Sequence, residues 1–296
     1  MKIQNRARIC LCVSAAIMVI ALVMSLCGFG INYGIDFAGG LNIQYNMGAA
    51  FEQADVETAL KNQGITEYAI STSGEAGSIV QIRVPTLSDE AEIQNLQNGL
   101  EAELSAKYTT MDTATATASY VGPIAGKVLV RNAVLSVVLA AALMLVYIAI
   151  RFDLSSGLAA VIGLVHDVLI MLSFMVILRS FVQMNSSFIA AMLTIVGYSI
   201  NNTIVIFDRI RENKKKMDTA DRDMIASTSV KECLGRTINT TLTTLVTIVA
   251  LYVLGVDAIR EFSLPIIVGI LAGVYSANMI NGYIWAMLES KLAKKA

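Results

Sequence analysis

Six long apolar stretches constrain the fold of this chain more than any other feature of its sequence. An α-helix needs about 20 predominantly apolar residues to cross the hydrocarbon core of a bilayer, and each stretch is long enough. The sequence therefore predicts a polytopic α-helical membrane protein with six transmembrane helices. Their predicted bounds are residues 9–31, 127–150, 157–178, 185–207, 237–255 and 262–288.

The composition supports this class of protein and excludes several others. Hydrophobic residues make up 55% of the chain and charged residues 15%, whereas soluble domains carry about 25% charge. The net charge of −1 and the lack of a large basic patch argue against a nucleic-acid partner. The single histidine and the spacing of the four cysteines offer no metal site or disulfide framework. Because hydrolase and phosphate-binding motifs are also missing, we expect no metal, no cofactor and no enzymatic activity.

The distribution of basic residues predicts the orientation of the chain in the membrane. Lys and Arg concentrate in the N-terminal segment 1–8, the charged segment 208–236 and the tail 289–296, and short basic loops favour the cytoplasm. Both termini are then cytoplasmic. The first apolar run exceeds the about 7–15 residues of a cleavable signal and lacks a clear A-x-A site, so we expect it to be retained.

The segment between the first two spans, residues 32–126, then lies outside the cytoplasm and has the pattern of a small α+β domain. Strand patterns occur at 41–45, 79–84 and 113–121, and helical patterns at 55–62 and after Ser88, which begins a capping motif. Residues 32–120 contain twelve Asp and Glu against three Lys and Arg. This acidity indicates either a solvated surface or a binding face for basic segments.

An ionisable pair lies near the middle of the third span, where His166 precedes Asp167. A charged side chain at this depth costs at least about 2.5–3.5 kcal/mol, so it needs a structural or functional reason. The pair can bind and release protons, since His titrates near neutrality and burial raises a carboxyl pKa. Alternatively, it hydrogen-bonds to neighbouring helices and locks the bundle. The sequence leaves both interpretations open.

Other polar residues in the spans predict contacts between helices. Asn201 and Asn202 in the fourth span carry amides, which bond to neighbours but do not titrate at physiological pH. Arg236 either marks the cytoplasmic edge of the fifth span or, one turn deeper, requires a carboxylate partner. The threonines of the fifth span and the pair Gly269 and Gly273 predict close helix packing.

Several of these sequence motifs together resemble those of the SecF family. Its members are subunits of the bacterial Sec protein translocase and belong to the RND-type superfamily. The resemblance covers nearly the whole chain, and its specificity comes from the order and positions of the motifs. They are the GIDFAGG segment with Gly34, Ile35, Asp36, Phe37, Gly39 and Gly40, the pair His166 and Asp167, the GYSIN segment ending at Asn201, the FDRIREN segment with Asp208 and Arg209, and Arg236.

The resemblance implies an accessory subunit of protein export in the bacterial plasma (inner) membrane. Its partners would be SecD, the SecYEG channel, a translocating preprotein and the surrounding lipid bilayer. Pairing with SecD would draw preproteins outward at the expense of the proton, or sodium, motive force. The external domain would have the ferredoxin-like fold of the family.

One position departs from the family pattern. SecF proteins commonly carry an acid where this chain has Asn202, which puts proton relay through this position in doubt. Our hypothesis is that SecD supplies the titrating acid, with Asn202 and Arg236 shaping its environment. The counter-ion of Arg236 would come from SecD or from Asp167. The competing interpretation is a self-contained RND-type exporter of small molecules or lipids that works as a homo-oligomer.

Overall fold

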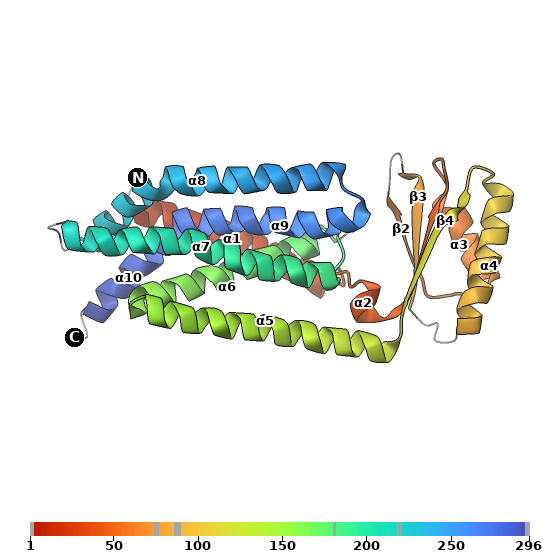
Figure 1. Ribbon diagram of the computed structural model, residues 1–296, viewed down its shortest axis with the longest axis horizontal. Helices are drawn as coiled ribbons and strands as arrows, with labels where there is room; N and C mark the ends of the chain where they lie inside the picture. Colours follow the sequence, from red (N-terminus) through yellow and green to blue (C-terminus); the bar gives the residue numbers. More distant parts are fainter. Residues whose placement is uncertain are drawn as a thin grey trace. The chain divides into compact units, whose positions relative to one another are not determined.

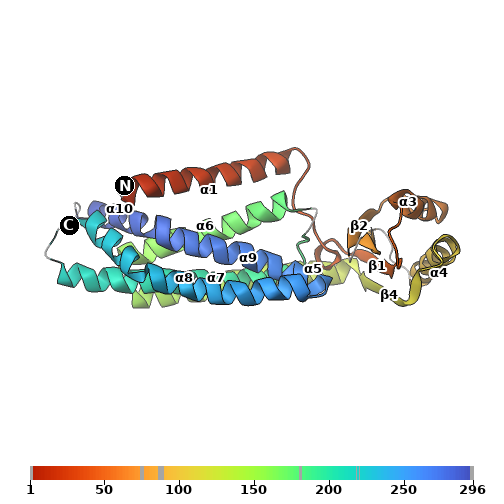
Figure 2. The ribbon, with the colours of Figure 1, turned by 90° about the horizontal axis from the view of Figure 1, so that it is seen from above.

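The structure, a computed structural model, describes residues 3–73, 77–85, 90–179, 182–217, 219 and 221–293. The chain divides into two compact units. The helical unit comprises Met1–Asn32 and Val134–Ala296, and the α/β unit comprises Tyr33–Ala133. Figure 1 labels most of the helices and strands of both units, and Figure 2 adds the label of β1.

The helical unit contains long apolar helices that run side by side (Figure 1). Six helical segments among the described residues are long and apolar enough to cross a membrane, which confirms the prediction of a polytopic helical membrane protein. The sixth is interrupted by a π-helical turn, η2. The elements are α1 (Ile3–Leu26), α5 (Pro123–Arg151), α6 (Leu154–Ile177), α7 (Ser186–Lys216), α8 (Arg222–Leu254), α9 (Asp257–Ser276), η2 (Ala277–Asn281) and α10 (Gly282–Ala293).

Side-chain caps begin three of these helices. Asp153, Asn185 and Asp221 accept hydrogen bonds from the first free backbone N–H groups of α6, α7 and α8, which satisfies donors that have no partner within the helix. The charged segment 208–236 is largely helical, because α7 runs to Lys216 and α8 begins at Arg222. The connection between the two helices is therefore only a few residues long.

Two glycines bring α9 close to α7. A Cβ atom at Gly269 would lie 2.5 Å from Ile195 Cγ1, and one at Gly273 would lie 3.2 Å from Ser199 Cβ. The four-residue spacing of these glycines thus forms the small-residue packing face that the sequence predicts. The central helices α6, α7 and α9 are about half buried within the unit, whereas α1, α5 and α8 are mostly exposed.

The α/β unit is an antiparallel sheet with two helices. Its strands have the order β2-β3-β1-β4, and all neighbouring pairs are antiparallel. Figure 2 shows α3 and α4 on the same face of this sheet. The elements are α2 (Ile35–Ala38), β1 (Gly40–Asn46), α3 (Gln53–Asn62), β2 (Ala69–Ser73), β3 (Ile79–Val84), α4 (Glu90–Lys107) and β4 (Asp112–Val121).

Strand alternation builds the core of this unit. Leu41, Ile43 and Tyr45 of β1 are fully buried or nearly so, together with Val80 and Ile82 of β3, because alternate side chains of a strand point to the same face. Leucines of α3 and α4 cover this face. Each fully buried aliphatic side chain contributes roughly 1.5–3 kcal/mol.

The sequence predicts three strands in this unit, and the residues that the structure describes form a four-stranded sheet. The missed strand β2 is five residues long, contains one large apolar residue, Ile70, and lies at an edge of the sheet. Its composition therefore lacks the alternation from which strands are predicted. The predicted cap at Ser88 lies outside the described residues.

The double glycine before β1 has a steric explanation. Gly39 and Gly40 have φ angles of 76° and 106°. Residues other than glycine adopt such positive φ angles only at a cost in free energy. Gly40 also passes close to β3, because a Cβ atom there would lie 2.5 Å from the Val84 carbonyl oxygen. The entry of the chain into β1 therefore requires glycine.

Replacing Gly40 with alanine is expected to destabilise the α/β unit more than the matched change Gly64→Ala. Both positions have a positive φ, which costs an alanine about 1–2 kcal/mol. Only Gly40 also meets backbone atoms, whereas a methyl group added at Gly64 would have no heavy atom within 4 Å. Thermal unfolding and limited proteolysis of the two purified variants measure the difference. Equal losses of stability would contradict the steric explanation.

A polar contact joins α3 to the end of α4. Lys107 Nζ lies 2.5 Å from Asp55 Oδ1, and the Tyr108 hydroxyl donates to the same carboxylate. The hydrogen bond from Lys107, followed by that from Tyr108, lowers the pKa of the Asp55 carboxyl below its usual range. The ionised form of Asp55 therefore stabilises the folded unit.

This lowered pKa predicts a pH dependence. The stabilisation is present above the ordinary carboxyl pKa and is lost as pH falls through the lowered pKa of the folded state. Between about pH 5 and about pH 2, hydrogen exchange of α3, corrected for its intrinsic rate, should accelerate more in the native chain than in Asp55→Asn. The Glu57→Gln change, at a partly exposed position on the same helix, should leave the native acid sensitivity unchanged. An identical acid response in all three proteins would refute this role of Asp55.

Candidate functional site

A buried histidine and a buried carboxylate of the helical unit lie side by side on α6. His166 Nδ1 is 2.9 Å from Asp167 Oδ1, and the two residues are 8% and 0% exposed. Among the described residues, Asp167 is the only carboxylate that is buried. The structure therefore brings together the pair that the sequence singled out.

Three serines from three other helices complete the hydrogen bonds of this pair. Ser14 of α1 lies with its Oγ 2.7 Å from His166 Nε2. Ser276, the last residue of α9, donates to Asp167 Oδ2 at 2.8 Å, and Ser199 of α7 donates to the same oxygen. With Asp167 ionised and His166 neutral, Nδ1 donates to the carboxylate and Nε2 accepts from Ser14. The Asp167 carboxylate thus links α6, α7 and α9, and His166 adds α1 to the cluster.

A tyrosine and a cavity lie on the α1 side of this cluster. The Tyr275 ring stacks on His166 with centroids 6.2 Å apart, and its hydroxyl donates to the Cys10 carbonyl at 2.7 Å. Ser14 and Tyr275 also line a cavity of about 310 Å³, whose other walls are apolar residues of α1, α6 and α9. His166 is therefore separated from this cavity only by Ser14 and Tyr275, which contact it and line the cavity.

The two asparagines of α7 have different surroundings. Asn202 is 2% exposed, and its Nδ2 has no hydrogen-bond partner among the described residues, whereas Asn201 is exposed. The neighbouring Thr203 accepts a 3.0 Å hydrogen bond from Asn281 of η2. The predicted helix contact is thus made next to Asn202 and not by its own amide nitrogen.

Arg236 is exposed on α8. Within the described part of the chain, no carboxylate lies within ion-pair distance of its guanidinium. Asp167 bonds to His166, Ser199 and Ser276 instead. Among the described residues, neither Asp167 nor another carboxylate therefore forms the ion pair with Arg236 that we considered from the sequence.

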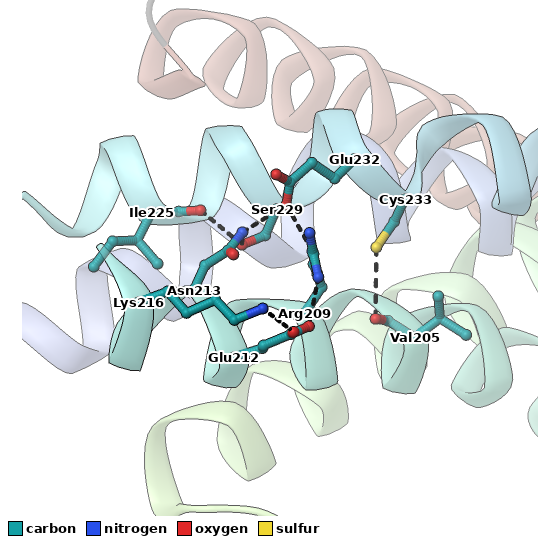
Figure 3. A network of polar contacts seen from close by, with 9 residues as sticks. All are labelled: Val205, Arg209, Glu212, Asn213, Lys216, Ile225, Ser229, Glu232 and Cys233. Carbon is teal, nitrogen blue, oxygen red and sulfur yellow. Dashed lines mark hydrogen bonds and ion pairs between the residues drawn. The ribbon is translucent and has the colours of Figure 1, made fainter.

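Asp208 and Arg209 make contacts at the C-terminal end of α7. Arg151 of α5 donates to both oxygens of Asp208, at 2.7 and 2.9 Å. Arg209 donates to Glu232 of α8 at 2.6 Å, and Asn213 reaches the same glutamate and Ser229 (Figure 3). These contacts join α7 to α5 and α8, so the role of Asp208 and Arg209 in this chain is structural.

The motif residues Gly34, Ile35, Asp36, Phe37, Gly39 and Gly40 belong to the α/β unit, where they form α2 and the entry into β1. No cluster of three or more metal-binding side chains occurs among the described residues. The sequence does not single out Ser14 and Tyr275 as members of the site. A single hydroxyl in an apolar span barely changes its hydropathy, and the sequence does not show which helix faces it.

Comparisons with known proteins agree with this arrangement. The family model for the C-terminal part of the protein export membrane proteins SecD and SecF matches residues 101–291, and the SecD/SecF GG motif model matches residues 25–47. Among solved structures, SecDF from Thermus thermophilus is 33% identical with a TM-score of 0.81, over 98% of this chain and 38% of that chain.

Two curated relatives show how much of each protein is shared. Protein translocase subunit SecF from Rickettsia felis is 35% identical over 292 residues, which cover 96% of this chain and 91% of that protein. Protein translocase subunit SecDF from Bacillus subtilis is 34% identical over 95% of this chain, but this chain spans only 37% of its length. The chain belongs to the SecD/SecF family of protein export membrane proteins and corresponds along almost its whole length to the SecF subunits.

Proposed function

We propose that this chain is a non-enzymatic accessory subunit of the Sec protein-export machinery that pairs with SecD. The observation that carries the proposal is its match to nearly the full length of translocase subunits named SecF. The relative named SecDF, of whose length this chain spans 37%, supports SecD as the partner. The complex would assist the SecYEG channel by drawing preproteins across the membrane.

The proposed location is the bacterial inner membrane, with both termini in the cytoplasm and the α/β unit outside. The positions of Lys and Arg near the spans support this orientation. For the α/β unit we propose a ferredoxin-like fold. The chain order β1-α3-β2-β3-α4-β4 and the strand order β2-β3-β1-β4 support this assignment.

Energy from the proton, or sodium, motive force would enter through intramembrane polar groups. For this chain, we assign proton binding to the pair His166 and Asp167. The pair is buried and joins four helices through hydrogen bonds, and a proton bound by either residue belongs to the coupled pair. Protonation of Asp167 would weaken its hydrogen bonds to Ser199 of α7 and Ser276 of α9 together. Proton binding would therefore change how tightly α6 is held to these two helices.

SecD would supply a second titrating acid. Asn202 cannot titrate, and Arg236 is an exposed cation on a membrane helix with no carboxylate within ion-pair distance in the described part of this chain. A cation on a membrane helix that makes no ion pair within its own chain favours a partner that carries an acid. The self-contained exporter considered from the sequence gains no support from the relatives, which are named as translocase subunits.

Asp167→Asn is expected to reduce ion-driven export by about 100-fold or more, on the scale of a lost proton-transfer group. The matched control is Ser276→Ala, which removes one hydrogen bond from Asp167 but keeps the carboxyl. pH-dependent infrared difference spectra of the SecD complex should show a carboxyl band that disappears in Asp167→Asn and remains in Ser276→Ala. If the native complex and Asp167→Asn give the same spectra, Asp167 does not titrate and serves only to hold the helices.

Replacing the intramembrane acid of SecD is expected to abolish the dependence of export on the ion gradient. The reason is that Asn202 leaves this chain without an acid at the corresponding position. Preprotein translocation into proteoliposomes, with and without a pH gradient, measures this dependence. The variant Asn202→Asp in this chain should restore part of it. Full gradient dependence without the SecD acid would contradict the proposal.

A further inference from the structure

A polar cavity lies where the first turns of α1 and α8 meet α10. Its volume is about 390 Å³. Arg8 comes from α1 and Arg222 from α8, and the remaining lining residues include both polar and apolar side chains. They are Gln4, Asp221, Asp223, Tyr283, Ala286, Met287 and Ser290.

The carboxylates in and around this cavity already have partners. Asp221 caps α8 by accepting from the N–H groups of Asp223 and Met224, and Asp223 accepts from Gln4. Glu289 lies within electrostatic range of Arg222, but Lys214 and Ser155 bind its two oxygens, at 2.5 and 2.6 Å.

The guanidinium groups of Arg8 and Arg222, in contrast, have no carboxylate within ion-pair distance in the described part of the chain. Two guanidinium groups from different helices therefore line one open cavity. Arginine forms paired hydrogen bonds to phosphate oxygens, and the Tyr283 hydroxyl adds a donor, whereas the Ser290 hydroxyl already donates to the Met287 carbonyl.

The length of α8 indicates the depth of the cavity in the membrane. Its 33 residues extend about 50 Å at 1.5 Å per residue, whereas the hydrocarbon core is about 30 Å thick. The N-terminal turns of α8 therefore reach the headgroup region or beyond it. Three consecutive lysines end α7, and basic residues at this level attract anionic lipids.

We propose that this cavity binds the phosphate of an anionic phospholipid, with Arg8 and Arg222 as its ligands. Ala286 and Met287 supply an apolar wall beside the phosphate for the glycerol and the upper acyl chains. The bound lipid would join α1 to α8 and α10. Such a link matters for α1, because little of this helix is buried within the unit.

Native mass spectrometry of the full-length protein tests the proposal, after extraction from membranes or exchange into phosphatidylglycerol or phosphatidylcholine. Phosphatidylglycerol should remain bound at one copy per chain, and phosphatidylcholine should not. Arg8→Gln and Arg222→Gln should each lower the retained phosphatidylglycerol by about tenfold, on the scale of a lost charge-assisted hydrogen bond. The matched control Arg6→Gln removes an exposed charge from the same helix, outside the cavity, and should retain the lipid.

Three outcomes would overturn the proposal. Equal retention of both lipids would show that the cavity does not select an anion. Equal loss in Arg6→Gln and Arg8→Gln would show only a general effect of surface charge. Binding of inorganic phosphate without phosphatidylglycerol would assign the cavity to a free anion. Arg222→Lys separates lost binding from misfolding, because it keeps the charge and should retain lipid at an intermediate level.

Discussion

The helical unit depends on one buried carboxylate. Asp167 is fully shielded from solvent in a bundle whose outer surface faces hydrocarbon, where an unsatisfied charge is costly. Its oxygens accept from His166 of its own helix and from Ser199 and Ser276 of α7 and α9, and His166 extends the connection to Ser14 of α1. The same hydrogen bonds that stabilise the pair also fix four helices relative to one another, so a structural role and a protonation role are compatible.

Close packing around this carboxylate depends on small side chains and on an irregular helix. Gly273 lets Ser199 approach α9, and Gly163 of α6 leaves room for Asn281. The π-helical turn η2 follows Ser276 directly and carries Asn278 and Asn281 inward. π-helical turns within helices often occur at functional sites. Toward the charged ends of α7 and α8, ion pairs replace this packing, as in the network around Arg209.

Most of the architecture was predictable because hydropathy and periodicity are local properties. The six spans follow from runs of apolar residues, and the core strands β1 and β3 from alternation along residues 41–45 and 79–84. The pair His166 and Asp167 was found because charge in an apolar span is rare. The strand β2 was missed because Ile70 is its only large apolar residue, and Ser14 was missed because one hydroxyl barely changes the hydropathy of a span.

The sequence by itself determined that the chain crosses a membrane, which residues are polar within it, and that position 202 carries an amide. Only the tertiary structure decided which of those polar residues meet. Asn202 and Arg236, 34 positions apart, differ in burial, and Ser14 and His166 touch across 152 positions. Hydropathy is a property of neighbouring residues along one helix and can be read from the sequence. A hydrogen bond between two helices depends on how each helix is rotated about its axis and how deep it lies in the membrane, and packing against the other helices sets both.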